Sequence, residues 1–407
     1  MSTGLGCNGD MAEFPFPPRE FGGPPEAYAD RRGGCPLGPV TLPSGDEVLL
    51  ATTYEDVREV HADARFTRNL RYPGAPRMLA GRDIPDDPHA LVNMDPPEHT
   101  RLRRIVQSAF TPRRAEEWRP QIQTLADELL DALASTSPPV DLMDAFAFPL
   151  PINIICRLLG VPAQDSPRFR VWSDVFLSTS TATAEERLKA GAEFAAYTDR
   201  LIAERREKPG SDLLDELINA HDAEDRLSEG ELARMVRGLI IAGHETTGHV
   251  IGRGVLTLLR HPDQMAAIRR EPDVLLSGAV EEILRTEVPG HGGLLRVATE
   301  DLTLPSGGAV SKGQAVLAPV VAANYDPQQF PDPDEFDIRR NAENRHLAFG
   351  HGPHYCLGAN LARVEIQVAI LSLIERFPGL ALAVPPDSLR WTTGSRICSL
   401  VALPVAW

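Results

Sequence analysis

One cysteine in the C-terminal part of the sequence has the surroundings of a nucleophile or a metal ligand. Cys356 follows a short segment, residues 349–355, that contains two glycines and a proline, and an apolar helix is expected directly after it. Unpaired backbone N–H groups and the dipole at the start of a helix lower the pKa of a thiol and favour the thiolate. A thiolate held on a rigid loop can serve as a nucleophile or as an axial ligand to iron.

Two other roles compete with these for Cys356. A lone cysteine is most often a buried structural residue, but the neighbouring glycines would let the backbone approach a large flat ligand closely. Zinc ligation by Cys356 with His346, His351 and His354 is disfavoured, because the segment has no second ligand pair at CxxC or HxxxH spacing. The nucleophile and iron-ligand roles therefore stay open.

A second candidate lies inside an apolar helix. Residues 235–259 are apolar nearly all round, which indicates burial, yet residues 242–249 read Ala-Gly-His-Glu-Thr-Thr-Gly-His. A carboxylate and hydroxyls within a buried helix are typical of a functional site. The Thr246 hydroxyl can bond to the carbonyl of Ala242, four residues back, and bend the helix.

The same segment does not fit a zinc-protease motif. His244 and His249 are five residues apart, so they lie about 140° apart around a helix, whereas ligands four residues apart are separated by about 40°. We expect the two rings to point to different sides. A structural alternative remains, in which Glu245 is half of a buried ion pair and Thr246 is a back-bonded core residue.

Composition restricts the class of protein. The 407 residues are 43% hydrophobic and 24% charged, as in packed globular proteins, and 41 basic against 57 acidic residues give a net charge of −16. This balance argues against nucleic acid as a partner. Five scattered cysteines predict no disulfide framework and a reducing compartment. Because no apolar run of about 18 residues and no signal peptide are recognisable, we expect a soluble, cytoplasmic protein without a membrane span.

Helical periodicity dominates after the first quarter of the chain. Helices are expected near residues 98–110, 113–134, 142–159, 165–177, 184–208, 211–221, 228–260, 262–270, 274–287 and from Cys356 to about Phe377. Short strands are expected at 294–297, 302–304 and 315–321. Residues 1–45 are expected to be a Pro/Gly-rich lead-in, and residues 46–407 a single, mainly α domain with small antiparallel β-sheets.

The Cys356 segment resembles the haem-binding loop of the cytochrome P-450 family. Residues 349–358 fit F-G-x-G-x-H-x-C-x-G, and residues 242–246 are similar to the family's oxygen-activation motif A/G-G-x-D/E-T. The resemblance extends from about Tyr54 to Trp407 and is closest to bacterial members that hydroxylate or epoxidise macrolides and other secondary metabolites. It implies the cytochrome P-450 fold, with haem between the long central helix and the Cys356 loop.

This resemblance also implies roles for particular residues. Cys356 would be the thiolate ligand of the iron. The other residues expected to bind the cofactor are Phe349, Gly350 and Gly358 in the loop, and His99, Arg103, Arg296 and His354 as donors to the propionates. The residues expected to act in catalysis are Glu245 and Thr246, an acid–alcohol pair that delivers protons, with Ala242 and Gly243 leaving space for O2. Glu282 and Arg285 match a structural E-x-x-R pair, for which Arg339 is the candidate third member.

The expected reaction is insertion of one oxygen atom from O2 into a bulky apolar metabolite in antibiotic or polyketide biosynthesis. The resemblance implies haem b as the cofactor, and electrons from NAD(P)H through a separate ferredoxin and ferredoxin reductase. An acidic donor could dock on Arg101, Arg104, Arg113 and Arg114 of a chain expected to be monomeric. The same centre could instead carry out oxidative ring coupling or another oxidation without hydroxylation. A haem carrier or sensor is the alternative of another class, and the acid–alcohol pair argues against it.

Overall fold

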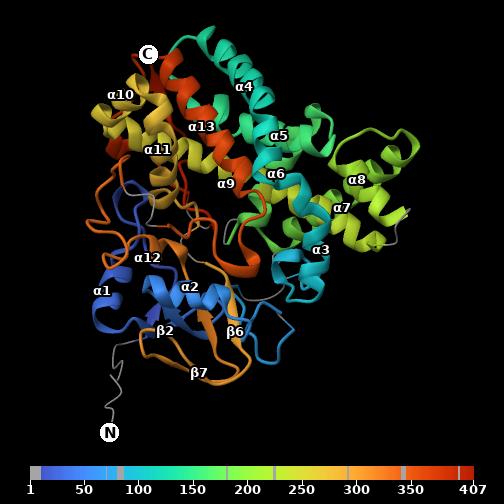
Figure 1. The fold of residues 1–407 in the computed structure, drawn as a ribbon, viewed down its shortest axis with the longest axis vertical. Coiled ribbons are helices and arrows are strands. Elements are labelled where there is room, and N and C mark those ends of the chain that lie inside the picture. The colour runs from blue at the N-terminus through green and yellow to red at the C-terminus, as the bar shows by residue number, and fades with distance from the viewer. Residues whose placement is uncertain are drawn as a thin grey trace.

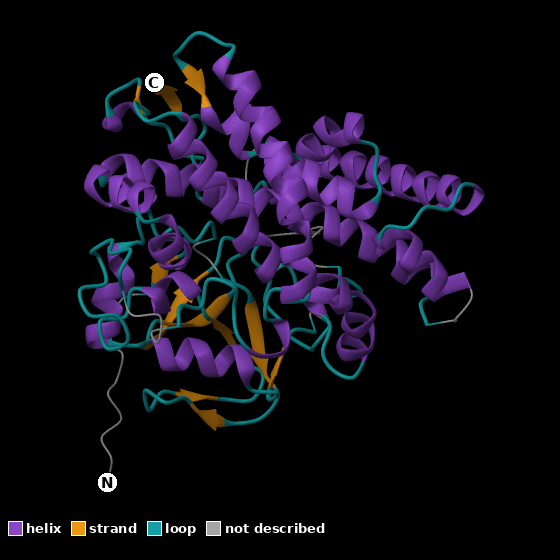
Figure 2. Cartoon of the chain, turned by 45° about the horizontal axis from the view of Figure 1, so that its top comes forward, coloured by secondary structure: helices purple, strands orange, loops and turns teal. Residues whose placement is uncertain are grey.

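The computed structural model describes residues 11–69, 71–79, 87–179, 182–222, 226–290, 293–340, 345–392 and 395–407. Most of the helices lie together in one part of the molecule, and the larger sheet lies toward the N-terminal end (Figure 1). Figure 2 shows a short strand pair beyond that sheet and further strands beside the C-terminus. The predicted class, mainly α with small sheets, is confirmed. Within the described residues, no helix combines the length and apolarity needed to cross a membrane.

The predicted helices are present with bounds close to those expected. In chain order the helices are α1 (Glu26–Gly34), α2 (Tyr54–Ala62), α3 (Glu98–Val106), α4 (Pro112–Ala134), α5 (Pro149–Leu159), α6 (Ser166–Leu177), α7 (Ala184–Glu207), α8 (Leu213–Asp222), α9 (Glu229–Arg260), α10 (Pro262–Arg270), α11 (Pro272–Thr286), α12 (Val320–Asn324) and α13 (Ala359–Arg376). The helix expected at 142–159 is divided into a π-helix, Met143–Ala147, and α5. Pro149 has no N–H to continue the helical hydrogen bonds, so a division at this point is expected.

The long helix α9 lies at the centre of the helical part. It begins at a capping box, in which the Ser228 backbone N–H donates to Glu231 and the Glu231 N–H donates to the Ser228 hydroxyl. Helices α5, α7, α10 and α13 pack against it, and most of its residues from 244 to 258 are buried. The middle of α9 is therefore held rigidly by neighbours on several sides.

The larger sheet joins segments from both ends of the chain. Its strands are β1 (Ala12–Glu13), β2 (Leu37–Thr41), β3 (Glu47–Ala51), β9 (Ala315–Leu317), β6 (Leu295–Ala298) and β4 (Phe66–Thr67), in that spatial order. The pairs β1–β2 and β3–β9 are parallel, so the expectation of purely antiparallel sheets is wrong for this one. Residues 12–45 are also part of the packed fold rather than a lead-in, because β1 and β2 belong to this sheet and α1 packs against β2.

The remaining strands form two small antiparallel sheets. One contains β7 (Leu302–Thr303) and β8 (Ala309–Val310), and the other contains β10 (Ala381–Leu382), β11 (Pro404–Ala406) and β5 (Val140–Asp141). The strand expected over 315–321 ends at Leu317, and α12 begins at Val320 directly after Pro319. The apolar run Val320–Val321 is thus the start of a short helix, because proline lacks the N–H that a continuing strand would pair.

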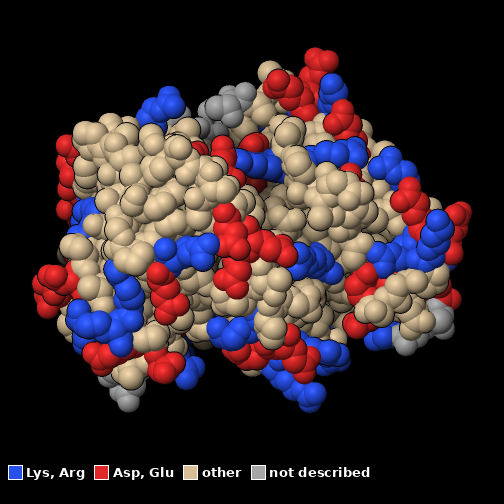
Figure 3. Space-filling model, turned by 90° about the horizontal axis from the view of Figure 1, so that it is seen from above, with Lys and Arg blue, Asp and Glu red and all other residues tan. Residues whose placement is uncertain are grey.

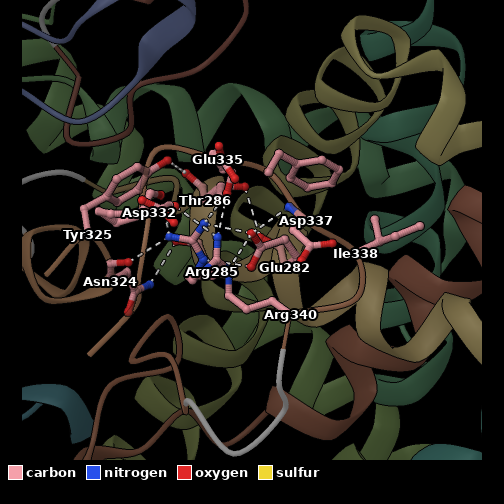
Figure 4. Close-up of polar contacts among 12 residues, drawn as sticks. Glu282, Arg285, Thr286, Asn324, Tyr325, Asp332, Glu335, Asp337, Ile338 and Arg340 are labelled. Atoms are coloured by element: carbon pink, nitrogen blue, oxygen red, sulfur yellow. Dashed lines mark hydrogen bonds and ion pairs between the residues drawn. The ribbon is translucent and has the colours of Figure 1, made fainter. Parts of the chain in front are cut away.

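The E-x-x-R pair of α11 is buried and holds the segment that follows α12 (Figure 4). Two nitrogens of Arg285 donate to the two oxygens of Glu282, each over 2.8 Å, and other Arg285 bonds reach the carbonyls of Asn324 and Glu335. The third basic member is Arg340, whose Nε donates to Glu282 over 3.1 Å. The prediction of Arg339 is wrong, since Arg340 takes this place and Arg339 is exposed.

Contacts from α11 and α12 also fix the start of the Cys356 loop. The Leu347 N–H donates to the side-chain oxygen of Asn324 over 2.7 Å. Glu281 on α11 contacts His346 over 3.1 Å and accepts from Arg363 on α13 over 2.7 and 3.0 Å. Burial opposes ionisation of Glu281, but the bonds from His346 and Arg363 outweigh it and lower its pKa to about 2. Both ends of the loop are therefore tied to one helix.

Candidate active site

The loop that carries Cys356 turns tightly before α13. The Gly350 N–H donates to the Leu347 carbonyl over 2.7 Å, and the Cys356 N–H donates to the Phe349 carbonyl over 2.8 Å. Gly350 and Gly352 have φ values of +73° and +69°, which side chains rarely adopt. A Cβ on Gly352 would also lie 2.7 Å from the Cα of Ala62. The glycines predicted to shape the loop are therefore required by it.

The Cys356 side chain is open to a ligand. Of the described cysteines, Cys156, Cys356 and Cys398 are free thiols, and Cys356 alone among these three is exposed. Cys35 is disulfide-bonded, which the scattered spacing did not predict. Cys356 thus combines a free thiol, exposure and a position three residues before α13.

The electrostatic surroundings of the Cys356 thiol are mixed. Protein packed around the sulfur raises its pKa, while the Gly358 N–H, the guanidinium groups of Arg103 and Arg363 and the Ala359 N–H lower it by less. The predicted net lowering is therefore wrong for the protein alone, although the predicted backbone donors are present. A metal ion at the sulfur would supply the charge that deprotonates a coordinating thiol.

One stripe of α9 is exposed although the helix is otherwise packed. Gly238, Ala242 and Thr246 are each exposed and follow one another at four-residue spacing, so they share one face. The Thr246 hydroxyl donates to the Ala242 carbonyl over 3.2 Å, as predicted. The Ala242 methyl group and the Thr246 hydroxyl therefore lie on a face of the helix that no other side chain of α9 covers.

Two glycines of the predicted site differ in what surrounds them. A Cβ added to Gly358 would meet nothing within 4 Å, so there is free space beside the Cys356 loop. A Cβ on Gly243 would instead lie 2.8 Å from the side chain of Ile155. Gly243 therefore allows α5 to pack closely on α9, and the expectation that it leaves space for O2 is wrong; Ala242 is the residue on the open face.

Buried basic side chains gather near the Cys356 loop. Arg296 on β6 is 2% exposed, and its Nη1 has no hydrogen-bond partner among the described residues. Burial and the charge of Arg68 lower the pKa of Arg296 to about 9. Arg68 is itself buried, with bonds to the Leu295 carbonyl and the Asn93 side chain. An unbalanced buried cation is unfavourable unless an anion binds.

The other predicted donors meet at the same place. The His99 and His354 rings lie 4.3 Å apart between centroids, and Arg103 donates to the Tyr355 carbonyl over 2.6 Å. Burial and nearby arginines lower the pKa of His354 to about 3, and burial followed by Arg103 lowers the pKa of His99. Both histidines are therefore neutral hydrogen-bond donors near pH 7.

Glu245 does not lie on the exposed stripe. Its two carboxylate oxygens lie 3.2 Å from Nε2 of His244 and 3.3 Å from Nε2 of His249, and all three side chains are buried. The five-residue spacing, from which the two rings were expected to point to different sides, did not predict that the long Glu245 side chain contacts both of them. Glu245 thus has two buried neighbours where the structural alternative foresaw one partner.

A cavity of about 350 Å³ opens beside this group. It is lined from three elements: Asp174 and Leu177 on α6, Glu245 and His249 on α9, and the C-terminal segment 391–401. A larger hollow, of about 680 Å³, is lined mainly by residues 16–27 and contains no residue of the predicted site. The smaller cavity is therefore the one that adjoins the motif of α9.

The fold and the sequence together define a protein of the cytochrome P450 family. The sequence matches this family over residues 161–393, and the chain belongs to it. It is 44% identical over 386 residues to mycinamicin IV hydroxylase/epoxidase of Micromonospora griseorubida, covering 93% of this chain and 94% of the relative. It is 42% identical over 406 residues to the cytochrome P450 monooxygenase PikC of Streptomyces venezuelae, covering 99% and 94%.

Solved structures show the same relationship. A crystal structure of the putative thioether synthase SgvP, involved in the tailoring step of griseoviridin, superposes with a TM-score of 0.93. It is 40% identical to this chain and covers 98% of this chain and 100% of its own. The resemblance found in the sequence is thereby confirmed, and the chain is an oxidoreductase of this class.

The family implies a haem, and the residues of this chain fit one. The Cys356 thiol is exposed, the space beside Gly358 is free, and the stripe Gly238–Ala242–Thr246 of α9 is open. Near the loop, the unpartnered Nη1 of Arg296 would be satisfied by a carboxylate. Haem is flat, its iron takes a thiolate ligand, and it carries two carboxylates, so it matches all of these features.

Several residues of the site escaped sequence reasoning. Arg68 adds positive charge next to Arg296, and Glu281 ties the loop to α11. The His61 ring contacts the Ala318 carbonyl over 3.1 Å, and burial and Arg296 lower its pKa to about 3. Each of these residues is a single charged or polar residue with no motif around it, so only the fold brings it to the site.

Proposed function

We propose that this chain is a monooxygenase that inserts one atom of O2 into a bulky, largely apolar secondary metabolite, by hydroxylation or epoxidation, in antibiotic biosynthesis. The main support is that the chain has both an exposed thiol directly before α13 and an exposed threonine hydroxyl in the otherwise packed α9. The relatives named as a hydroxylase/epoxidase and as a monooxygenase support the same reaction class.

Oxidation without hydroxylation is the second candidate, because the relative with the TM-score of 0.93 is named a putative thioether synthase. Both reactions would use the same centre and differ in the fate of the substrate. The screen that tests both is a panel of antibiotic precursors, incubated with the enzyme and its redox proteins under ¹⁸O2. A product that gains one labelled oxygen supports the first candidate, whereas a product that only loses hydrogen supports the second.

When bound, haem b supplies an iron that activates O2 with electrons from NAD(P)H, delivered through a separate ferredoxin and its reductase. In the proposal, the Cys356 thiolate holds the iron, and Phe349, Gly350 and Gly358 shape the backbone around it. The carboxylates are held by two charged donors, Arg103 and Arg296, and by two neutral ones, His99 and His354. Arg296 contributes most to haem binding, because a bound carboxylate would give its unpartnered guanidinium nitrogen an acceptor.

The residues of α9 have separate tasks in the proposal. Ala242 is small and keeps space open on the exposed stripe. Thr246 holds a proton at Oγ1, where the bond to the Ala242 carbonyl fixes the orientation of the hydroxyl and leaves its lone pairs free to accept another proton. Glu245 is the adjacent carboxylate through which protons reach Thr246. Apolar packing around α9 limits bulk water, so protons arrive through side chains at a controlled rate.

Replacing Thr246 by alanine is expected to uncouple electron use from product formation. Without the hydroxyl, the product formed per NAD(P)H oxidised should fall by about 10-fold or more, with hydrogen peroxide or water formed instead. Thr247→Ala is the matched control, because Thr247 is the next residue but is buried away from the exposed stripe. Equal coupling in Thr246→Ala and the wild type would count against the proposed role and would favour a passive haem binder.

The docking surface for the electron donor can be narrowed within the predicted arginine cluster. Arg101 pairs with Glu231, and Arg113 and Arg114 pair with Glu117. Arg104 is exposed and forms no ion pair with another residue that the structure describes. Figure 3 shows acidic and basic side chains interspersed over the upper face of the molecule, without a patch of one sign. We infer that Arg104 is the member of the cluster that an acidic ferredoxin would contact most strongly.

Arg104→Glu is therefore expected to raise the KM for the ferredoxin by about 3- to 10-fold at low ionic strength. The difference should shrink at high salt, since exposed charges are screened there. Arg270→Glu, an equal charge reversal at the exposed end of α10, is the control and should leave this KM unchanged. If both reversals raise the KM equally, the effect comes from net charge and Arg104 is not at the interface.

A further inference from the structure

Glu245 is held between two imidazoles that are themselves fixed. The Nδ1 of His244 lies 2.7 Å from the Ile240 carbonyl, so this nitrogen carries a hydrogen. The His249 ring packs edge-on against Phe148, with 4.9 Å between ring centroids, and its Nδ1 contacts the Ser399 hydroxyl. The Nε2 atoms of both rings lie 3.2 and 3.3 Å from the carboxylate, but Oε1, the oxygen nearest His244, has no hydrogen-bond partner among the described residues.

This arrangement keeps Glu245 ionised near neutral pH. Burial opposes ionisation of Glu245, but His244 and His249 beside it outweigh burial and lower its pKa to about 2. A carboxylate with so low a pKa carries almost no proton at pH 7. A proton that passes through Glu245 must therefore come from a neighbouring donor at the moment of transfer.

The two histidines differ in their access to solvent. His249 lines the cavity of about 350 Å³ together with Asp174 and Glu245. His244 is not among the residues that line it, is 1% exposed, and has the Ser173 hydroxyl 3.3 Å from its Nε2. Within the described part of the chain, His249 is therefore the member of the pair that can exchange protons with the cavity.

We propose that His249 is a positioning residue that loads Glu245 with protons taken from the cavity. This inference rests on the proposed function, in which Glu245 passes protons to Thr246. In the step, the N–H bond at Nε2 of His249 breaks and an O–H bond forms at the facing oxygen of Glu245. The neutral imidazole then regains a proton from solvent in the cavity, so one proton moves and no electrons do.

The other charged groups around Glu245 and His249 are consistent with proton transfer from the cavity to Glu245. Asp174 on α6 lines the same cavity. Burial and then the charge of Glu245 raise the pKa of Asp174, while Arg170 and the two histidines lower it by less. Asp174 can therefore collect protons at the cavity more readily than an ordinary surface aspartate. From the C-terminal segment, the group that faces His249 is the uncharged Ser399 hydroxyl.

The test compares His249→Gln with His244→Gln in the haem-loaded enzyme supplied with its redox proteins and a substrate. Both variants remove one imidazole from the same carboxylate at nearly the same distance. We expect His249→Gln to lower turnover by about 10-fold or more and to raise the solvent deuterium isotope effect. His244→Gln should change turnover by less than about 3-fold and leave the isotope effect as in the wild type, because it leaves the path from the cavity intact. Equal losses in both variants, or no loss in either, would overturn the proposal.

A second measurement does not depend on turnover. Imidazole ¹⁵N NMR of the reduced, CO-bound protein reports the protonation of His249 directly. We expect a hydrogen at Nε2 of His249, bonded to the Glu245 carboxylate, in the wild type and a weaker bond at this nitrogen in Glu245→Gln, where the charged acceptor is gone. An Nε2 without a hydrogen in the wild type would refute the inference. Failure of the proposed function would show differently, as a wild-type enzyme with a hydrogen at Nε2 of His249 but no O2-dependent product.

Discussion

Replacing Cys356 by serine is expected to leave a folded protein whose O2-dependent turnover is at least about 1000-fold lower, equivalent to about 4 kcal/mol of barrier. The physical reason is that a hydroxyl at this position is a poor donor to iron, whereas a thiolate pushes electron density toward cleavage of the O–O bond. The fold should survive because Cys356 is exposed and its backbone bond to Phe349 does not involve the sulfur.

The control for this variant is Cys398→Ser. Cys398 is a free, partly buried thiol in the C-terminal segment, and its backbone accepts a bond from Arg253 and donates one to the Pro289 carbonyl. Its replacement should alter turnover by less than about 3-fold. Turnover of Cys356→Ser within about 10-fold of the wild type would show that another residue holds the iron.

Arg296→Leu is expected to have opposite effects on the protein with and without haem. In the haem-free protein, removal of an unpartnered buried cation should raise the free energy of unfolding by about 1–3 kcal/mol. In the haem-bound protein, the same change leaves a propionate without its charged donor and should weaken haem binding by about 10- to 100-fold. A merely structural arginine would lower stability in both states.

The two effects of Arg296→Leu can be measured separately. Urea denaturation of the haem-free chain gives the first, and transfer of haem to an excess of a haem-scavenging globin gives the second. Arg345→Leu serves as the control, since Arg345 is an exposed arginine just before the loop and should change neither quantity. Haem retention equal to that of the wild type in Arg296→Leu would remove this residue from the propionate site.

Features that depend on local sequence were predictable. The Cys356 loop follows from glycines that alone tolerate its positive φ angles, and the back-bond of Thr246 follows from the geometry of a helix. The long α9 was predictable from its apolar run and its Ser228–Glu231 cap. These signals lie within a few residues of the feature that they predict.

Features that depend on tertiary packing were not predictable in the same way. Arg340 rather than Arg339 reaches Glu282, because the coil after Ile338 decides which of two adjacent arginines points inward. Gly243 serves the approach of Ile155 on another helix. No pattern in the sequence places Arg68 beside Arg296, since these residues meet only through the pairing of β4 with β6.

The proton path shows the same limit within a single helix. Helical spacing gives the directions in which the His244 and His249 side chains leave α9. It does not show how far the Glu245 side chain between them can reach. The Glu245 side chain is long enough to reach both rings, and Ser399, which contacts His249, comes from the far end of the chain. The site could thus be identified from the sequence, whereas the residues proposed to supply its protons could be identified only from the folded structure.

The central claim is that the Cys356 thiolate holds a haem iron, and the absorption spectrum of the reduced, CO-bound protein tests it most directly. The account predicts the strongly red-shifted haem band of a thiolate ligand in the wild type, in Thr246→Ala and in Cys398→Ser, and loss of that shift in Cys356→Ser. A wild-type spectrum without the shift, or a shift that persists in Cys356→Ser, would contradict it.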